Sequence, residues 1–368
     1  MLLYIHIPFC DSKCFYCAFN SYTSKFNLKQ DYMKALEYQL KDNIKRHIID
    51  KNKKIKTVFI GGGTPSTIKP ELYNEIFKLF LPHLEKDAEI TVEANPNSAT
   101  VSWQQAMFDL GVNRISFGVQ SFDDKKLKFL GRAHSSKSAI EAIENANRIG
   151  FKGINCDIIY GVVDDSFESL KKDFDIIKTL PINHISAYSL IIEEETKFFL
   201  MEKERQKSLK SLKIDDEELS YEIFSYLENM GFKQYEIANF AKDKKYESKH
   251  NYGYWSYTEY LGVGAGAVAC IENQREYSKK SLENYISNPL KVEFEKLSNQ
   301  DIKEEKILLG LRCKSGFNID LLSNDELKKA NYLIEEKKLF LYEDDKDGRK
   351  IVNKNFLLAD ELALYILD

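Results

Sequence analysis

The sequence lacks any apolar run that approaches the ~20 residues a helix needs to cross a bilayer. Its N-terminal stretch MLLYIHIPF is too short for a signal peptide and carries no basic n-region. The formal net charge is only −4, so no basic excess favours nucleic acid or an anionic membrane as a partner. The sequence therefore predicts a protein with no transmembrane segment and no nucleic-acid partner.

Low-complexity linkers are also absent, and the only repetition is an alternation of strand-like and helix-like segments. The 368 residues are 43% apolar and 30% charged, which is typical of a globular protein. This length allows one large domain and a smaller one.

Cysteine is scarce, but three of the six cysteines stand together as C-x3-C-x2-C, at Cys10, Cys14 and Cys17. Thiolates at this spacing can hold three corners of a cubane iron–sulfur cluster and leave one iron open. A structural zinc site usually takes four ligands from paired spacings, and no second C-x2-C is present. Disulfides need an oxidising compartment. The cysteines therefore predict a [4Fe–4S] cluster in a reducing cytoplasm.

Short apolar, β-branched runs alternate with segments of helical periodicity along the first half of the chain. The predicted strands are Leu2–Ile7, Thr57–Ile60, Ile90–Glu93, Arg114–Val119, Gly153–Tyr160 and Ile182–Leu190. The predicted helices between them are Tyr32–Ile49, Glu71–Leu84, Ala99–Leu110, Ser136–Ile149 and Phe167–Leu180. This order indicates right-handed βαβ units and a parallel sheet, but it does not separate an open barrel from a doubly wound sheet.

Unusual residues gather where the predicted strands end. The cysteines follow the first strand, Gly61–Gly63 follow the second, and Glu93 ends the third. Because ligands bind at the carboxyl ends of parallel strands, this edge is the predicted site.

The segment YIHIPFCDSKCFYCAF resembles the radical S-adenosylmethionine (SAM) superfamily. The similar branch holds the oxygen-independent coproporphyrinogen III oxidases and their haem-chaperone relatives. NRISFGVQSFDDKKLKFLGRAHS and GFKGINCDIIYG are similar to consecutive motifs of that branch. The resemblance implies an α/β fold with a partial (β/α)6 barrel and SAM bound to the open iron of the cluster. Reductive cleavage of SAM in that superfamily yields a 5′-deoxyadenosyl radical.

The resemblance also implies the SAM contacts. The positions that match are Tyr4, Glu93, Gln120, Arg132 and Asp157, with Tyr188 a looser match. Glycine-rich GGGTPS would bring Gly62, Gly63 and Thr64 to the SAM amino group, although an ordinary βα turn is the alternative. A guanidinium at Arg132 suits the SAM carboxylate. The stretch 162–165, VVDD, replaces a Leu-Pro-Gly-like turn of the family and alters a loop rather than these contacts.

A second motif, HNYGYW, places His250, Asn251, Tyr254 and Trp255 close together. An H-N-x-x-Y-W motif here is similar to the haem-chaperone branch, where it is linked to haem binding. Imidazole is an axial ligand of haem iron, and the two aromatic rings can pack on a porphyrin face. The alternative is that His250 caps a turn and the aromatic rings fill a core.

Phe19 argues against the oxidases, which typically carry a fourth cysteine at this position and an extension ahead of the cluster loop. Three hypotheses stay open: a haem carrier that hands haem to an acceptor, a radical decarboxylase of coproporphyrinogen III, and a radical SAM enzyme with another substrate. We favour the first, with a respiratory haem protein as acceptor, no coproporphyrinogen oxidase activity, and a homodimer as an open expectation.

The chain is expected to divide into three parts. Residues 1–195 form the partial barrel, and residues 196–298 form a family-specific region that carries the HNYGYW motif. Residues 299–368 read as a small, mostly helical, winged-helix-like domain.

Overall fold

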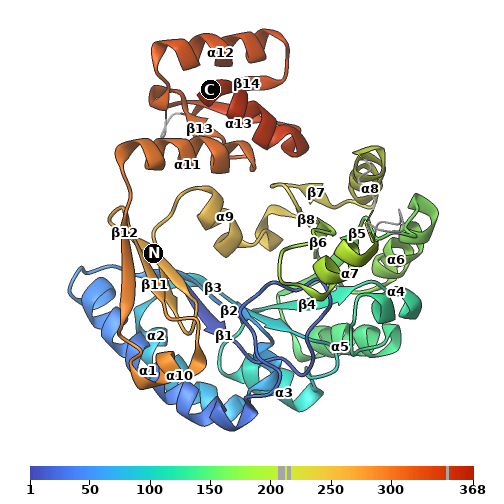
Figure 1. The fold of residues 1–368 in the computed structure, drawn as a ribbon, viewed down its shortest axis with the longest axis vertical. Helices are drawn as coiled ribbons and strands as arrows, with labels where there is room; N and C mark the ends of the chain where they lie inside the picture. Colours follow the sequence, from blue (N-terminus) through green and yellow to red (C-terminus); the bar gives the residue numbers. More distant parts are fainter. Residues whose placement is uncertain (206–211, 214–216, 345–347) are drawn as a thin grey trace.

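The structure is a computed structural model that describes residues 1–205, 212–213, 217–344 and 348–368. Its centre is a run of six parallel neighbouring strands in chain order, as Figure 1 shows. These strands are β1 (Leu2–Ile7), β2 (Ile55–Gly62), β3 (Leu84–Ala94), β4 (Arg114–Gln120), β5 (Gly153–Tyr160) and β6 (His184–Ser189). All six predicted strands are confirmed, and so is the partial (β/α)6 barrel.

The two faces of these strands differ in chemistry because side chains alternate along a strand. One face is apolar and packs into the main core, for example through Ile5, Val58 and Ile115. The opposite face carries polar side chains in register, such as Glu93, Ser116 and Asn155 on three neighbouring strands. The apolar outer face therefore packs into the core, and the polar inner face can bind ligands inside the barrel.

Helices cover the apolar face (Figure 1). They are α1 (Lys29–Ile44), which continues as a π-helical turn over Lys45–Ile49, then α2 (Asn74–Phe80), α3 (Val101–Asp109), α4 (Asp124–Phe129), α5 (Ser136–Ile149) and α6 (Phe167–Thr179). Their ends follow local signals: Ser135 and Ser166 each form a capping box, and Gly150 ends α5 with a φ of 109°. α4 was not among the predicted helices.

The second half of the chain extends the same sheet at both edges, which the sequence did not predict. The 12-stranded order is β12-β11-β10-β9-β1-β2-β3-β4-β5-β6-β8-β7. The added strands are β7 (Lys233–Gln234), β8 (Asn239–Ala241), β9 (Tyr260–Val263), β10 (Val268–Ile271), β11 (Gln274–Ser278) and β12 (Val292–Lys296). β9 pairs in parallel with β1, so the glycine-rich 262–267 segment lies beside the first strand.

In the described part of the chain, four helices lie between β6 and β12 in sequence order: α7 (Lys197–Arg205), α8 (Glu217–Asn229), α9 (Lys249–Trp255) and α10 (Leu282–Ser287). α7 is described as far as Arg205, and residues 206–211 and 214–216 lie outside the described residues. α9 carries the HNYGYW motif and packs against β2.

The C-terminal part has its own small core, separate from the main one. It contains α11 (Asn299–Leu311), β13 (Phe317–Asn318), α12 (Asn324–Glu335), β14 (Leu339–Asp344), β15 (Gly348–Asn353) and α13 (Ala359–Leu367). A three-stranded sheet with three helices agrees with the expected winged-helix-like module. It lies next to α9, which contacts α11 (Figure 1).

In the described ranges, none of the helices combines the length and the apolar character required to cross a membrane.

Candidate cluster, cofactor and haem site

The three N-terminal cysteines lie on one loop, residues 8–22, which follows β1 and folds back on itself. We call this segment the cluster loop. Tyr22 closes this loop: its N–H donates to Pro8 O at 2.8 Å, and its carbonyl accepts from Cys10 N at 3.1 Å. Within the loop, Cys17 N donates to Cys14 O at 3.2 Å. These backbone bonds hold three thiols on a short closed segment at the carboxyl end of β1.

Two of the thiols accept hydrogen bonds from the barrel. Thr64 Oγ1 donates to Cys10 Sγ at 3.3 Å, and Arg132 Nη1 donates to Cys14 Sγ at 3.1 Å. Burial raises the pKa of Cys10 and of Cys17. A coordinated metal would deprotonate the thiols, and the donors from Thr64 and Arg132 suit the resulting thiolates.

The donor set fits a cluster better than a single ion. In the described part of the chain, no group of three or more His, Cys, Asp or Glu side chains is placed to hold one metal ion. Each cysteine of a cubane cluster binds a different iron, so its thiolates need not meet at one point. Cys10, Cys14 and Cys17 are free cysteines on one loop, and these residues would hold the cluster.

Two backbone hydrogen bonds of Phe15 join the middle of the cluster loop to the rest of the protein. Its N–H donates to Leu130 O at 3.1 Å, and its carbonyl accepts from Phe198 N at 2.8 Å. The Phe15 ring lies against Gly131, where an added Cβ would come within 2.6 Å of the ring. Gly131 also has a φ of +73°, so glycine is needed here for two reasons. This contact positions the next residue, Arg132, beside the loop.

Asn95 joins the glycine-rich segment to Arg132, a role that the sequence analysis missed. Asn95 Nδ2 donates to Thr64 Oγ1 at 3.2 Å, and Asn95 Oδ1 accepts from Arg132 Nη2 at 2.6 Å. A chain of hydrogen bonds therefore runs from Cys10 through Thr64, Asn95 and Arg132 to Cys14. The position of Asn95 directly after a strand was the available signal.

We expect Asn95→Ala to lower the free energy of unfolding by ~1–3 kcal/mol, because the half-buried guanidinium of Arg132 loses one of its acceptors. Urea denaturation of the wild type and the variant measures this. Asn97→Ala is the control, since Asn97 is exposed on the same loop and should change stability by less than ~0.5 kcal/mol. Equal stability of both variants would contradict a bridging role.

The predicted SAM segment uses its backbone amides internally. Gly63 N donates to Ile7 O at 2.8 Å, Thr64 N donates to Phe9 O at 2.7 Å, and Gly62 N donates to Glu93 Oε2 at 3.0 Å. This segment can therefore offer a ligand only carbonyl oxygens. Carbonyl oxygens accept from an ammonium group, which agrees with the expected contact to the SAM amino group.

Arg132 lies beside Cys14 rather than free in the barrel mouth. Its Nη2 also donates to the Gly118 carbonyl in a very short contact, and its Nε is buried without a partner among the described residues. Burial tends to lower the pKa of Arg132, but Tyr16 and Cys14 outweigh it and raise the pKa overall. The buried Nε leaves one donor for a ligand carboxylate.

Glu93 and Asp157 are two half-buried residues whose carboxyls lie on the inner face. Burial is the main reason why the pKa of Glu93 rises to about 7, and the charge of Asp157 adds to it. Burial also raises the pKa of Asp157, against the hydrogen bonds from Asn155 and Ser186. Asn155 Nδ2 donates to Asp157 Oδ1 at 2.6 Å. A group whose pKa is about 7 is partly protonated near neutral pH, so Glu93 can both donate to and accept from a ribose hydroxyl.

The raised pKa of Glu93 makes stability depend on pH. The folded protein binds this proton more tightly than the unfolded chain, whose pKa lies near 4.5. The free energy of unfolding should therefore fall by about 3 kcal/mol as the pH rises from ~4.5 to above 7. In Glu93→Gln this fall should shrink, and the variant should be more stable than the wild type at pH 8. Chemical denaturation without SAM at both pH values measures it; an unchanged slope would contradict the assignment.

Gln120 and Tyr188 occupy the same mouth of the barrel. Gln120 has a φ of 71°, a strained conformation for a residue with a side chain, at an irregularity in the pairing of β4 with β5. Such strain concentrates at functional sites. Gln120 Nε2 lies 3.1 Å from where a Cβ on Gly118 would be, next to Arg132. Tyr188 keeps 43% of its surface exposed, and burial of its hydroxyl raises its pKa.

A cavity of about 720 Å³ connects the cluster loop with α9. Its walls include residues from β1, β2, β9, the cluster loop and α9, namely Tyr4, His6, Lys13, Ala18, Phe19, Phe59, His250, Asn251, Tyr254 and Tyr260. Phe19 keeps 69% of its surface exposed. The volume is in the range of small-molecule sites, and the wall combines aromatic rings with polar and charged side chains. Residues about 230 positions apart in the chain thus share one cavity.

His250 is held at the inner wall by hydrogen bonds to both ring nitrogens. Nδ1 pairs with Thr57 Oγ1 at 2.7 Å, and Nε2 pairs with Tyr254 Oη at 3.1 Å. The ring stacks on Phe59 at a centroid distance of 5.1 Å, and burial lowers its pKa to about 3. The imidazole is therefore neutral, and it can reach an iron only if Nε2 leaves Tyr254. Neutral imidazole is the form that binds metals.

Trp255 does not line this cavity, in contrast to His250, Asn251 and Tyr254. Its indole Nε1 is buried without a hydrogen-bond partner among the described residues, as are both carboxylate oxygens of Glu236. Burial is the main reason why the pKa of Glu236 rises to about 7. The predicted haem contact of Trp255 gains no support from this cavity.

Comparisons with known proteins agree with the motifs. A family model of the radical SAM superfamily matches residues 4–176. The chain is 36% identical over 323 residues to the haem chaperone HemW of Bacillus subtilis (strain 168), across 85% of this chain and 83% of that protein. It is 37% identical over 277 residues to the haem chaperone HemW of Escherichia coli (strain K12), across 72% of this chain and 68% of that protein.

The structural comparison concerns the fold. Coproporphyrinogen III oxidase (HemN) from Escherichia coli superimposes with a TM-score of 0.78 across 99% of this chain and 89% of that chain. At 20% identity, this likeness shows the fold alone.

Proposed function

Because the chain belongs to the HemW family of the radical SAM superfamily, we propose that it is a haem chaperone. It binds haem and a [4Fe–4S] cluster with SAM, and it transfers haem to an acceptor protein. The relatives from Bacillus subtilis and Escherichia coli, which match this chain over 83% and 68% of their lengths, carry the name haem chaperone, which supports this choice over an enzyme for another substrate.

The observation that carries the proposal is the cavity between the cluster loop and α9. It joins the exposed ring of Phe19 to His250 and Tyr254, so an apolar ring system can lie between aromatic side chains. Lys13 also lines the cavity, and a lysine there can pair with a propionate of haem. Haem is proposed to occupy this cavity, with His250 as the leading candidate for the axial ligand.

The cluster is assigned to Cys10, Cys14 and Cys17, and SAM to the barrel mouth beside it. When bound, the cluster would supply an open iron for the amino and carboxylate groups of SAM. Thr64 and Arg132 donate to the thiolates and orient them. Carbonyl oxygens at Gly62 and Gly63 receive the SAM amino group, and Glu93 meets the ribose hydroxyls. Gln120, Asp157 and Tyr188 line the same mouth.

Phe19 separates this proposal from radical decarboxylation of coproporphyrinogen III. The fourth cysteine of that oxidase pattern is replaced here by a ring that lies in the wall of the cavity. We therefore propose that the chain does not oxidise coproporphyrinogen. The acceptor is proposed to be a respiratory haem protein; the cytoplasmic location and the homodimer stay predictions.

The test is anaerobic. The protein with its reconstituted cluster is titrated with haem, and in a second reaction it is incubated with SAM, a reductant and coproporphyrinogen III. We expect saturable haem binding with a shifted Soret band, and no protoporphyrinogen. Transfer is then followed as loss of that band when an apo-haem protein is added. Turnover of coproporphyrinogen without stable haem binding would overturn the proposal and favour the oxidase.

A further inference from the structure

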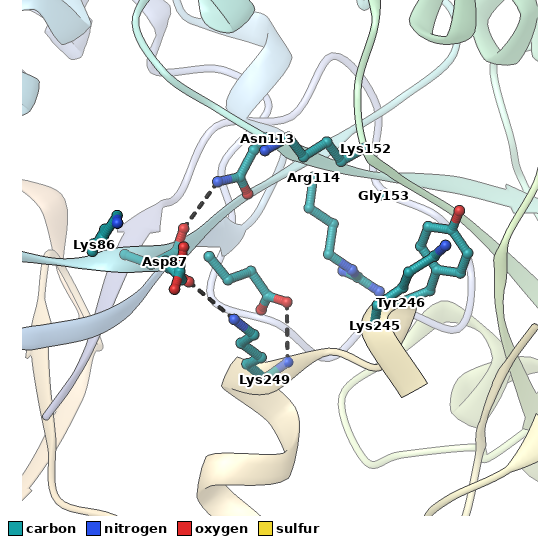
Figure 2. A pocket seen from close by; sticks show the side chains of 11 residues that line it. Lys86, Asp87, Asn113, Arg114, Lys152, Gly153, Lys245, Tyr246 and Lys249 are labelled. Carbon is teal, nitrogen blue, oxygen red and sulfur yellow. Dashed lines mark hydrogen bonds between the residues drawn. The ribbon is translucent and has the colours of Figure 1, made fainter. Parts of the chain in front are cut away.

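A second cavity, of about 460 Å³, lies at the opposite end of the barrel from the cluster loop. It opens at the amino-terminal ends of β4 and β5, where Arg114 and Gly153 stand (Figure 2). Glu89 of β3 also lines it. The segment before α9 and the first residue of α9 close its other side. Active sites of parallel barrels lie at the carboxyl ends of the strands, so this cavity is separate from the site described above.

Its lining is strongly basic. Five cationic residues line it, Lys86, Arg114, Lys152, Lys245 and Lys249, against two acidic residues, Asp87 and Glu89. The ammonium of Lys249 donates to Asp87 O at 2.9 Å. Glu89 is already engaged: its two oxygens accept from Lys249 N at 3.0 Å and His250 N at 3.1 Å. The lining therefore carries an excess of positive charge on a protein whose net charge is −4.

Arg114 is the buried centre of this cavity. It is only 5% exposed, yet in the described part of the chain its Nε has no hydrogen-bond partner and its guanidinium makes no ion pair within 4.0 Å. Figure 2 shows the side chain extending from β4 toward Lys245 and Tyr246. A buried guanidinium without an acceptor is costly, and such a group points to a missing anion.

The backbone around Arg114 makes room for this side chain. Arg114 pairs with Gly153 across β4 and β5, and a Cβ on Gly153 would come within 2.7 Å of Arg114 Cγ. Asn113 is fixed by Ile90 N, which donates to its Oδ1 at 3.0 Å, and by its own bond to Ala88 O at 2.9 Å. The charge of Arg114 also reaches Glu93 and Asp157, but it donates no hydrogen bond to either.

We propose that this cavity binds the diphosphate group of a small molecule, with Arg114 as the central ligand. A guanidinium matches phosphate oxygens in a two-pronged contact. An excess of several positive charges favours a multiply charged diphosphate over a single carboxylate. Two sources share this chemistry, inorganic pyrophosphate and a nucleoside diphosphate. Tyr246 lines the cavity and offers a ring for a nucleobase.

The test is calorimetric titration of the 368-residue protein, with its cluster but without haem or SAM, so the result is independent of the proposed function. Pyrophosphate and ADP are the two probes, and we expect saturable one-to-one binding that weakens with salt. Tighter binding of ADP assigns the site to a nucleoside diphosphate, and equal binding assigns it to the diphosphate alone. Either result supports the site.

Variants separate this site from nonspecific attraction. Arg114→Met should weaken binding ~10-fold or more, because a charged hydrogen-bonding partner is lost. Arg114 is buried, so Lys86→Ser with Lys152→Ser provides a second variant at two exposed positions, expected to weaken binding severalfold. The matched control is Lys125→Ser with Lys128→Ser, two exposed lysines on α4.

Three results would overturn the proposal. The first is no saturable binding of either probe up to ~10 mM. The second is an equal loss of binding in the Lys86/Lys152 variant and in the Lys125/Lys128 control. The third is tighter binding of a single-stranded RNA than of both probes.

Discussion

Cys14→Ser is expected to abolish the [4Fe–4S] cluster, with bound iron and sulfide falling to near zero after anaerobic reconstitution. The thiolate is the ligand of iron, and a serine hydroxyl does not ionise near neutral pH. Cys14 is also the thiol to which Arg132 donates at 3.1 Å, so its loss removes both a corner of the cluster and a contact with the barrel. Iron and sulfide analysis and the visible absorption of the cluster measure this loss.

Cys270→Ser is the matched control. Cys270 is a half-buried free cysteine on β10, far along the chain from the loop. This variant should retain the cluster content of the wild type, which shows that the loss in Cys14→Ser is not a general effect of removing a thiol. Full cluster content in Cys14→Ser would refute the ligand assignment.

Haem binding should respond in opposite directions to two substitutions on α9. His250→Ala should weaken haem binding at least ~10-fold and shift the Soret band, because the proposed axial ligand is gone. Tyr254→Phe should strengthen binding by about fivefold, since it removes the hydrogen bond of ~1 kcal/mol that holds His250 Nε2 away from iron. Haem titration followed by absorption spectra measures both effects.

Tyr252→Phe is the control on the same helix, because Tyr252 does not line the cavity, and its haem affinity should equal that of the wild type. His250 is buried, so folding of His250→Ala is checked by circular dichroism before titration. Loss of haem binding in Tyr254→Phe with an unchanged spectrum in His250→Ala would show that the phenol of Tyr254, rather than the imidazole, meets the iron.

The sequence by itself determined the parts of this protein that depend on short spacings. C-x3-C-x2-C puts three thiols on one loop whatever surrounds it, and the alternation of strand-like and helix-like segments predicts parallel βαβ units. The six central strands and the small C-terminal module followed from such local patterns. GGGTPS and HNYGYW were also recognisable without a structure.

Only the tertiary structure decided which distant residues meet. Asn95 bridges Thr64 and Arg132, and β9 joins β1 across more than half of the chain, through pairings that local periodicity does not encode. His250 of the HNYGYW motif lies in the cavity wall and Trp255 does not, because residues five positions apart on a helix point in different directions. Likewise, Arg114 is an ordinary strand residue in the sequence and becomes the buried centre of a basic cavity only when three strands and α9 converge.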